Sequence, residues 1–461
     1  MDDRKDVPLG FQTRALHSGA RPCPSTGARA VPIYQTASYV FQDTDHAAAL
    51  FNLEDFDNIY SRMSNPTVSV FEERMASLEG GAAAVATASG QSAQFLTIAS
   101  LCRAGDDFLS ASTLYGGTFT AFDTTYRNFG FNAIFVAPDD PQAFKAALTP
   151  TTRLIYVETM GNPRINIADI AALAEIAHAA HIPLVVDNTF ATPFLCRPIE
   201  FGADIVIHSA TKFLGGHGTS LGGIVIDSGN FDWNSGHFPQ LNQPSPAYHG
   251  KCLSDLFPKI AFASKVRLEA LRDIGPCLSP FNAFQILQGV ETLTPRMKLH
   301  CENTQKVAEH LASHPLVTWV NYPGLPDSPY YDLGKKYLPK GCGAVFTFGI
   351  VGGIDAGRNF IESLRIFSHL ANVGDAKSLV IHPASTTHQQ LPKAAREAAG
   401  VTDEMVRVSV GLEDIEDLIA DIDQALEASQ KPRAKIKDRK SDLMKRRIRR
   451  AQQEMMRWKE K

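Results

Sequence analysis

The stretch IPLVVDNTFATPFLCRPIEFGADIVIHSATK, residues 182–212, contains two apolar runs that are each followed by a charged side chain. LVV and DIVIH have the length and β-branched content of strands buried on both faces. Asp187 ends the first run, and Lys212 follows the second by four residues. Lysine is rarely buried without a partner, so Lys212 either extends to solvent or is held at the strand end for chemistry.

Further apolar runs flank this stretch and alternate with helical patterns. The runs are AAAVATAS, DDFLSAS, FNAIFVA, TRLIYVET and GGIVIDS, and IADIAALAEIAHAAH has apolar residues three and four positions apart. Alternating strands and helices predict an α/β protein with a mostly parallel seven-stranded sheet and helices on both faces. Ligands bind such sheets at the carboxyl ends of the strands, so we expect the site near Asp187 and Lys212.

The sequence pattern divides the chain into four parts. Residues 1–62 are rich in Pro, Gly, Thr and Asn and lack long periodic segments, which predicts an extended arm. Residues 63–260 contain the predicted sheet, and residues 261–428 have the pattern of a smaller C-terminal α/β domain. Residues 429–461 form a basic tail.

Length and composition are those of a globular protein. The chain has 461 residues and 44% hydrophobic content, which is enough for two domains. No apolar run reaches the roughly 18 residues needed to span a bilayer, and the polar N-terminus lacks a signal-peptide core, so we expect a cytoplasmic protein. The seven cysteines are scattered without a C-x-x-C pair, which argues against a zinc knuckle or a disulfide framework; no metal site is expected.

The basic tail differs in charge from the rest of the chain. From residue 430 onward, 14 Lys or Arg stand against 4 Asp or Glu, although the whole chain has a net charge of −4. An apolar stripe with helical spacing runs among these basic residues: Met444, Ile448, Ala451, Met455 and Trp458. Such a helix can contact RNA, an acidic membrane surface or a partner helix; a solvated or disordered extension is the alternative.

Two loops that follow predicted strands contain candidate ligand-binding groups. Ser89, Gly90 and Gln91 lie between a strand and an apolar helix, where backbone N–H groups and the helix dipole favour a phosphate. Small residues at such a junction also serve simply to make a turn. Tyr115, in STLYGGT, follows another strand and either stacks on a planar ligand or packs against the protein.

The two charged residues complete this set. An aspartate at the end of a buried strand needs a cationic partner, either a structural ion pair or a protonated ring nitrogen. A lysine, an aspartate, an aromatic plane and a phosphate cradle are together the parts that a pyridoxal 5′-phosphate (PLP) site requires. The histidines near these motifs are interpreted as packing or turn residues: His208, His217, His382 and His388.

Longer stretches resemble a known family. They include GARAVPIYQTASYVF, NIYSRMSNPTVSVFEERMASLEGG, SPFNAFQILQGVETL, HLANVGDAKSLVIHPASTTH and VRVSVGLED, besides the stretch quoted first. Over about residues 11–427 the chain is similar to the Cys/Met-metabolism family of PLP enzymes. This resemblance implies the fold-type I PLP-dependent transferase fold, with an arm, a large PLP-binding domain and a smaller C-terminal domain. It also implies a homotetramer built from dimers with shared active sites.

The resemblance assigns roles to the cofactor-binding groups. Lys212 resembles the lysine that binds PLP covalently, Asp187 the partner of the pyridine nitrogen, and Tyr115 the tyrosine that stacks on the ring. The phosphate is expected to be bound by Ser89, Gly90, Gln91, Ser209 and Thr211.

Further residues are assigned by the same comparison. Tyr60 and Arg62, in YSRMSNP, correspond to residues that reach the phosphate from the adjacent subunit. Asn162 corresponds to a residue near the phenolic oxygen of the cofactor. Arg407 resembles the arginine that binds the substrate carboxylate, a role suited to its bidentate fork, and Asn372 is expected to assist it.

The implied activity is a γ-replacement on an amino acid. Sulfide or methanethiol would displace acetate from O-acetyl-L-homoserine, giving homocysteine or methionine, with Lys212 as the base and Tyr115 sharing the proton transfers. Related γ-lyases have a cysteine where Gly117 stands, and cystathionine synthases and lyases have an SLGG-type segment where this chain reads ANVGDAKS. The alternatives are cystathionine γ-synthase or γ-lyase activity, or a catalytically silent scaffold that acts through the tail.

Overall fold

The computed structural model describes residues 9–386, 389 and 400–431. A seven-stranded sheet has the strand order β1-β7-β6-β5-β4-β2-β3. Its strands are β1 (Ala83–Thr87), β2 (Asp107–Ala111), β3 (Asn132–Val136), β4 (Thr152–Glu158), β5 (Leu184–Asp187), β6 (Ile205–His208) and β7 (Gly223–Asp227). The strands from β2 to β6 pair in parallel, and β7 is antiparallel to both of its neighbours. The mostly parallel sheet predicted from the sequence is therefore confirmed.

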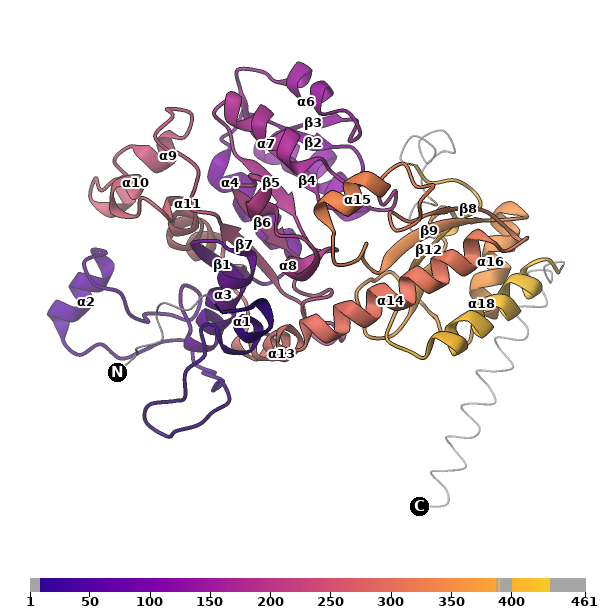
Figure 1. Ribbon diagram of the computed structural model, residues 1–461. Helices are drawn as coiled ribbons and strands as arrows, with labels where there is room; N and C mark the ends of the chain where they lie inside the picture. Colours follow the sequence, from indigo (N-terminus) through magenta and orange to yellow (C-terminus); the bar gives the residue numbers. More distant parts are fainter. Residues whose placement is uncertain (1–8, 387–388, 390–399, 432–461) are drawn as a thin grey trace, which may run out of the picture.

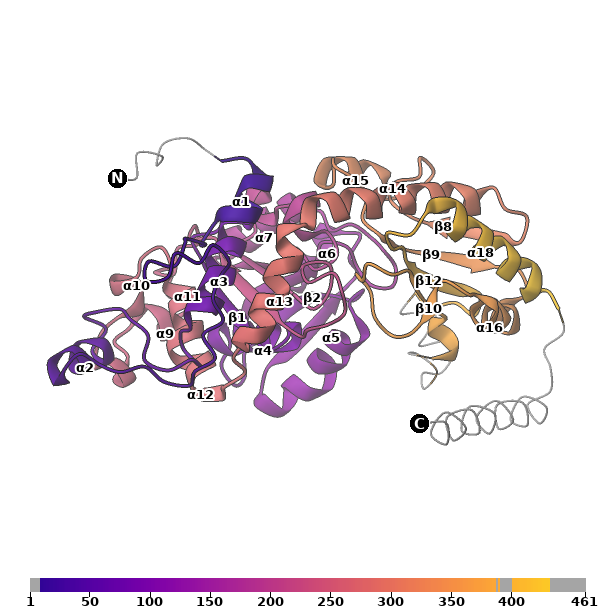
Figure 2. The same cartoon turned by 90° about the horizontal axis from the view of Figure 1, so that it is seen from below.

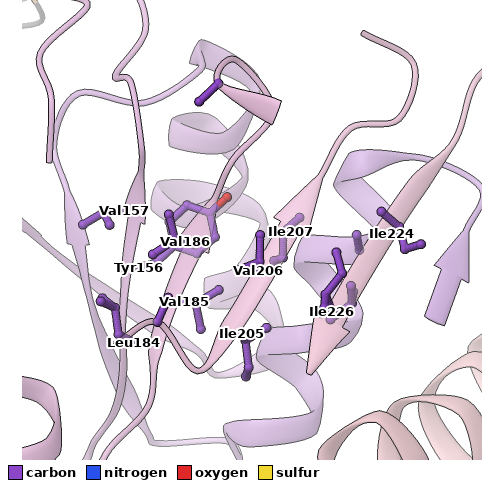
Figure 3. Packing of buried hydrophobic residues seen from close by; sticks show 14 of the residues in the cluster. Tyr156, Val157, Leu184, Val185, Val186, Ile205, Val206, Ile207, Ile224 and Ile226 are labelled. Carbon is purple, nitrogen blue, oxygen red and sulfur yellow. The ribbon is translucent and has the colours of Figure 1, made fainter. Parts of the chain in front are cut away.

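The apolar runs form the centre of this sheet because both of their faces are covered. The three apolar residues of β5 and all the residues of β6 are buried, and they pack with side chains of β4 and β7 (Figure 3). Three helices pack against these strands: α3 (Pro66–Glu79), α4 (Gly90–Leu101) and α7 (Ile170–Ala179). Strands covered in this way form continuous hydrophobic runs rather than alternating ones, as the sequence has them.

Capping residues in the sequence explain where two of these helices begin and where one of them ends. The Asn65 side chain caps the start of α3 by accepting hydrogen bonds from the backbone N–H groups of Thr67 and Val68. The helix ends at Gly80, whose φ of 81° is the left-handed conformation that glycine adopts easily. Ser89 caps α4 in the same way, so that this helix starts at the carboxyl end of β1.

A second, smaller sheet has five strands in the order β10-β11-β12-β9-β8. Its strands are β8 (Val317–Asn321), β9 (Val345–Ile350), β10 (Ser368–His369), β11 (Leu379–Ile381) and β12 (Met405–Ser409). Helices α16 (Gly353–Ser363) and α18 (Ile415–Ser429) lie side by side next to it (Figures 1 and 2). Their apolar residues and those of the strands form a second hydrophobic core.

One long helix, α14 (Leu293–Ala312), belongs to both cores. Its first turns bury Leu293 and Met297 in the core of the large sheet, whereas Val307 and Leu311 lie in the core of the small one. Figures 1 and 2 show it running from one sheet to the other. A residue on α14 can therefore hold elements of the two sheets in a fixed relation.

The predicted arm contains two short helices, α1 (Phe11–His17) and α2 (Thr44–Phe51). The first packs against α3, whereas α2 stands away from both sheets (Figures 1 and 2). Large apolar side chains of this segment are exposed: Val40 is 98% accessible, Phe51 61% and Phe56 68%. Apolar side chains gathered on one exposed segment are typical of a surface that another chain covers.

The boundaries at residues 62, 260 and 428 stay predictions. Buried residues beyond 260, among them Phe262 and Ala283, share the core of the large sheet. The segment 261–274 is helical throughout, with a π-helical stretch (Val266–Leu271) between α11 (Ala261–Lys265) and α12 (Arg272–Ile274). The apolar stripe of the tail, Met444 to Trp458, lies outside the described residues. Within the described ranges, no helix is long and apolar enough to cross a membrane.

Candidate active site

A cavity of about 190 Å³ opens at the carboxyl ends of β4, β5 and β6, where the small sheet faces the large one. Eleven of the thirteen residues predicted from the sequence line it: Ser89, Gly90, Gln91, Tyr115, Asn162, Asp187, Ser209, Thr211, Lys212, Asn372 and Arg407. Other lining residues were not predicted: Gln94, Thr118, Glu158, Met160, Thr189, Phe190, Leu221, Ala371 and Val373. The structure therefore brings together, in one cavity, residues that are up to 318 positions apart in the chain.

Asp187, the last residue of β5, presents an ionisable carboxyl group to this cavity. Its Oδ1 accepts hydrogen bonds from Thr189, from the backbone N–H at 3.0 Å and from the hydroxyl at 2.5 Å. Its Oδ2 accepts one from the Tyr156 hydroxyl at 3.2 Å. Burial raises the pKa of Asp187, and the hydrogen bonds from Thr189 oppose that shift. No described Lys or Arg makes an ion pair with this carboxylate, so it is free to accept a bond from a cationic ligand.

Glu158 lies beside Asp187, because the ends of β4 and β5 pair in register. Its Oε1 accepts a hydrogen bond from the Tyr115 backbone N–H at 2.8 Å. Burial, and then the charge of Asp187, raise the pKa of Glu158 well above its ordinary value. Burial therefore raises the pKa values of both neighbouring acids, Glu158 and Asp187.

Lys212 follows β6, the neighbour of β5, and lines the same cavity. Its Nζ donates a hydrogen bond to Asn372 Oδ1, and no carboxylate is its partner among the described residues. Burial, and then the charge of Arg407, lower the pKa of Lys212 to about 8. Lys212 is thus held in the site rather than extended to solvent, in a form that gives up its proton readily.

Arg296, on α14, holds the backbone immediately after Lys212. Its guanidinium donates hydrogen bonds to the carbonyls of Phe213 at 2.9 Å, Leu214 at 3.3 Å and Gly289 at 2.7 Å. Burial lowers the pKa of Arg296 to about 10, and the structure gives it no carboxylate partner in the described part of the chain. The turn that carries Lys212 is therefore held by the helix that joins the two cores.

A set of small residues meets at the start of α4. The first N–H groups of this helix have no partner within it. A Cβ added at Gly90 would lie 2.7 Å from Ser209 Cβ, so only glycine lets the helix end pack this closely against Ser209. Thr211 also borders the cavity, although its hydroxyl is paired with the backbone of Gly222. Unpaired N–H groups and a hydroxyl at the N-terminus of a twelve-residue helix suit an anion such as phosphate.

Tyr115 stands at the entrance to the cavity and is 53% exposed. It immediately precedes α5 (Gly116–Thr120). A Cβ added at Gly117 would lie 2.6 Å from Cε1 of the Tyr115 ring. The absence of a side chain at 117 therefore permits this position of the ring, and a residue such as cysteine there would displace it.

Arg407 reaches the cavity from β12 in the small sheet. Its Nη1 donates a hydrogen bond to Asn162 Oδ1 at 3.0 Å, and its Nη2 lies 3.5 Å from the Asn372 carbonyl. Burial lowers the pKa of Arg407 to about 10, and Tyr115 opposes that shift; among the described residues, no Asp or Glu forms an ion pair with this guanidinium. The guanidinium fork is therefore available to a carboxylate ligand. The Asn372 side chain, by contrast, contacts Lys212 and not Arg407.

Two predicted residues, Tyr60 and Arg62, are not among the residues that line the cavity. The Arg62 guanidinium carbon lies 4.8 Å from the centre of the Tyr60 ring, and its side chain packs near Gly275. The arm residue Tyr60 is 41% exposed. Within one chain, therefore, these two residues are separated from the groups that they were predicted to join.

The histidines near the motifs do not line the cavity. His208 is fully buried against Glu79, and His217 contacts the Gly215 carbonyl in a turn. His382 is buried and contacts Ser385, and His388 lies outside the described residues. In the described ranges, no cluster of His, Cys, Asp and Glu has the arrangement of a metal site.

Comparison with known proteins gives consistent matches over nearly the whole chain. Residues 12–427 match the family described as Cys/Met metabolism PLP-dependent enzyme. An O-acetyl-L-homoserine sulfhydrylase from Leptospira meyeri is 52% identical over 92% of this chain and 98% of its own length. A homocysteine synthase from Schizosaccharomyces pombe is 51% identical over 91% of this chain and 98% of its own length.

A solved structure shows the same fold. A crystal structure from Campylobacter jejuni, assigned as an O-acetylhomoserine (thiol)-lyase, covers 91% of this chain and 100% of its own, with a TM-score of 0.88 and 40% identity. That structure contains N′-pyridoxyl-lysine-5′-monophosphate, a covalent product of PLP and a lysine.

Proposed function

Because this chain belongs to the Cys/Met metabolism PLP-dependent enzyme family, we propose that it exchanges acetate for sulfur on O-acetyl-L-homoserine. The reaction breaks the Cγ–O bond to acetate and forms a Cγ–S bond with sulfide, giving homocysteine, or with methanethiol, giving methionine. The observation that carries this proposal is that Lys212 and Arg407 line the same cavity. Among the described residues, neither side chain is paired with a carboxylate: Lys212 contacts Asn372, and Arg407 contacts Asn162. The names of relatives that are 47–52% identical support it.

The residues of the cavity fit PLP, the cofactor on which this enzyme family depends. Because Gly90 has no side chain, Ser209 can pack closely against the start of α4. The N–H groups of that helix end can then bind a phosphate beside the Ser209 hydroxyl. Asp187, which lacks a cationic partner in the described chain, would accept a bond from a protonated ring nitrogen, and Lys212 would bind the cofactor covalently. When bound, the cofactor supplies a sink for the electron pair left when a bond to Cα of the substrate breaks.

Lys212 is proposed to move protons between Cα and Cβ of the substrate. Departure of acetate from Cγ requires that protons leave both carbons, and formation of product requires that they return. Burial and the neighbouring Arg407 lower the pKa of Lys212 to about 8, which leaves a useful fraction of free amine near neutral pH. Tyr115, at the entrance, is proposed to stack on the cofactor and to share in these proton transfers.

Arg407 is proposed to bind the α-carboxylate of the substrate. Asn162 already orients its guanidinium through Nη1, and the remaining N–H groups can bind a carboxylate in a bidentate manner. Asn372 is proposed to assist at the same end of the cavity. Binding of the carboxylate by Arg407 would bring the substrate Cα toward Lys212, because both side chains border the same cavity.

We further propose that the active enzyme is a homotetramer built from dimers that share active sites. Tyr60 and Arg62 lie outside the cavity of their own chain, and the exposed apolar side chains of the arm need a covering surface. Both observations are explained if the arm of one copy reaches the phosphate end of another. All seven cysteines are free thiols, which supports the proposed cytoplasmic location.

The test is an assay with O-acetyl-L-homoserine and sulfide, with Lys212→Ala beside the wild type. We expect homocysteine and acetate in equal amounts from the wild type, and neither from the variant. Faster product with cysteine as the nucleophile would replace the proposal by cystathionine synthesis. Release of 2-oxobutyrate and ammonia without a thiol would replace it by γ-elimination. Cofactor absorbance without any of these reactions would leave the scaffold alternative.

A further inference from the structure

A buried network outside the cavity connects two of the elements that form it. Glu79, the last residue of α3, has no exposed surface. Its Oε1 accepts hydrogen bonds from Asn188 Nδ2 at 2.9 Å and from His208 Nε2 at 2.6 Å. Asn188 and His208 are also fully buried. A carboxylate is expensive to bury, so a network of this kind calls for an explanation.

The position of the two donors in the chain gives that explanation. Asn188 directly follows Asp187 at the end of β5, and His208 directly precedes Ser209 at the end of β6. One carboxylate oxygen thus holds the neighbour of the group proposed for the ring nitrogen and the neighbour of a group proposed for the phosphate. These two groups would contact different parts of the cofactor, the ring nitrogen and the phosphate.

Other contacts fix the same two strand ends. The Asn188 side chain also donates to the Cys196 carbonyl at 2.9 Å, and its Oδ1 accepts from the Thr159 hydroxyl at 2.8 Å. Above the network, the Thr189 hydroxyl accepts from the Ser209 backbone N–H at 2.8 Å and donates to Asp187. The ends of β5 and β6 are therefore connected by hydrogen bonds in two places, between residues that line the cavity and between buried residues that do not.

Two atoms of the network, Glu79 Oε2 and His208 Nδ1, are buried and have no hydrogen-bond partner among the described residues. Burial has the largest effect on Asp187 and raises its pKa, whereas hydrogen bonds from Thr189 and, to a smaller extent, the electrostatic effect of His208 oppose that shift.

We propose that Glu79 is a positioning residue for the cofactor, which fixes the separation of Asp187 and Ser209 through Asn188 and His208. It does not touch the cofactor, and its effect is on cofactor affinity. The proposal rests on the PLP site and not on the sulfur-transfer activity, so the two can fail independently.

The test compares Glu79→Leu and Glu79→Gln by titration of the cofactor-free protein with pyridoxal 5′-phosphate. Leucine removes the acceptor, so we expect the dissociation constant to rise at least about 10-fold, which corresponds to about 1.4 kcal/mol. Glutamine keeps an acceptor oxygen for both donors, and we expect its dissociation constant to stay within about 3-fold of the wild-type value. Thermal unfolding of the cofactor-free proteins measures stability separately.

Glu72 provides a matched control on the same helix. It lies seven residues earlier on the same face of α3, is almost fully buried, and accepts a hydrogen bond from the Ala86 backbone N–H. It does not line the cavity. Glu72→Leu is expected to lower the unfolding temperature without a change in cofactor affinity.

Three results would overturn the proposal. The first is wild-type cofactor affinity in Glu79→Leu, and the second is an equal loss in Glu79→Gln, because an acceptor oxygen would then not be what Glu79 supplies. The third is an equal loss in Glu72→Leu, which would indicate general destabilisation. If Glu79→Leu does not fold, Thr159→Val replaces it, since it removes only the hydroxyl that holds Asn188. An affinity loss of about 3-fold is expected there, and an unchanged affinity overturns the proposal.

Discussion

The two sides of the cavity carry acidic and basic side chains, respectively, and hold them in different ways. On the side of the seven-stranded sheet, Asp187 and Glu158 end adjacent strands and already accept hydrogen bonds from the protein. On the side of the five-stranded sheet, the hydrogen bonds of Arg407 within the described residues go to neutral groups, Asn162 Oδ1 and the more distant Asn372 carbonyl. The acidic groups on the first side are therefore already held in place by the protein, whereas the Arg407 guanidinium on the second side keeps N–H groups that can bind a ligand.

This difference corresponds to the two ligands of such an enzyme. A cofactor that stays bound is best held by groups that are already oriented, because little ordering is then needed when it binds. A substrate that enters and leaves in each cycle needs a group that can exchange partners. Lys212 lies between the two sides: its backbone is held by Arg296 on α14, and its amine contacts Asn372.

Removal of the Lys212 amine should have the largest effect, because both sides depend on it. For Lys212→Ala we expect the turnover of O-acetyl-L-homoserine to fall by at least about 10⁴-fold, the upper range of general acid–base catalysis. Homocysteine formation measures it. Lys336→Ala is the control, since Lys336 pairs with Asp169 outside the cavity. A variant at Lys212 that retained more than about one hundredth of the activity would contradict the proposed role.

Asp187→Asn tests the fixed side. Loss of one charge aimed at the reacting system typically costs about 10²- to 10³-fold in kcat, and we expect a loss in that range together with weaker retention of the cofactor on dialysis. Asp227→Asn is the control. Asp227 is buried in the same sheet and accepts hydrogen bonds from the backbone N–H groups of Gly229 and Ala263, away from the cavity. Equal losses in the two variants would mean that the effect is on the fold.

Arg407→Lys tests the exchangeable side. Lysine keeps the charge but loses the planar fork, so we expect the KM for O-acetyl-L-homoserine to rise about 10- to 100-fold and kcat to change less. The KM for sulfide should not change, because sulfide has no carboxylate. Arg164→Lys, at an ion pair with Asp139 outside the cavity, is the control. A fall confined to kcat would show that Arg407 does not bind the substrate carboxylate.

The fixed side could be predicted from the sequence, because its groups stand at recognisable strand ends. Asp187 closes an apolar run, and Lys212 follows another, so their meeting at one edge of the sheet follows from the parallel pairing of β5 and β6. The positions of Arg407, Asn162 and Asn372 came from the family resemblance alone. No local pattern indicates that β12 of a separate sheet faces this edge.

Supporting residues escaped prediction because their partners are distant in the chain. Arg296 looks like an ordinary helix residue, and only the fold shows that it binds carbonyls 82 and 83 positions away. Glu158 ends a strand just as Asp187 does, but its role as the neighbouring acid depends on the register of β4 against β5. Tyr60 was predicted for the site and lies outside the cavity of its own chain, which is consistent with action on another copy.

The smallest effect should be on stability, and it sharpens the contrast between the two sides. In the cofactor-free protein, burial and Arg407 lower the pKa of Lys212 to about 8, below its ordinary value of 10.5. Below pH 8 the amine is charged in both the folded and unfolded states, and the folded state bears the cost of burying it. Between pH 8 and 10.5 the unfolded chain binds more protons than the folded one, so this cost disappears as the pH rises.

Lys212→Met should therefore stabilise the cofactor-free protein at pH 7, by about 2 °C in unfolding temperature, and this advantage should fade as the pH approaches 10.5. Thermal unfolding from pH 7 to 10.5 measures it, with Lys336→Met as the control for loss of an exposed lysine. An advantage that stayed constant or grew with pH would mean that Lys212 is not a buried cation in the empty site. In that case Lys212 would not belong to the groups that the protein holds in place before the cofactor binds.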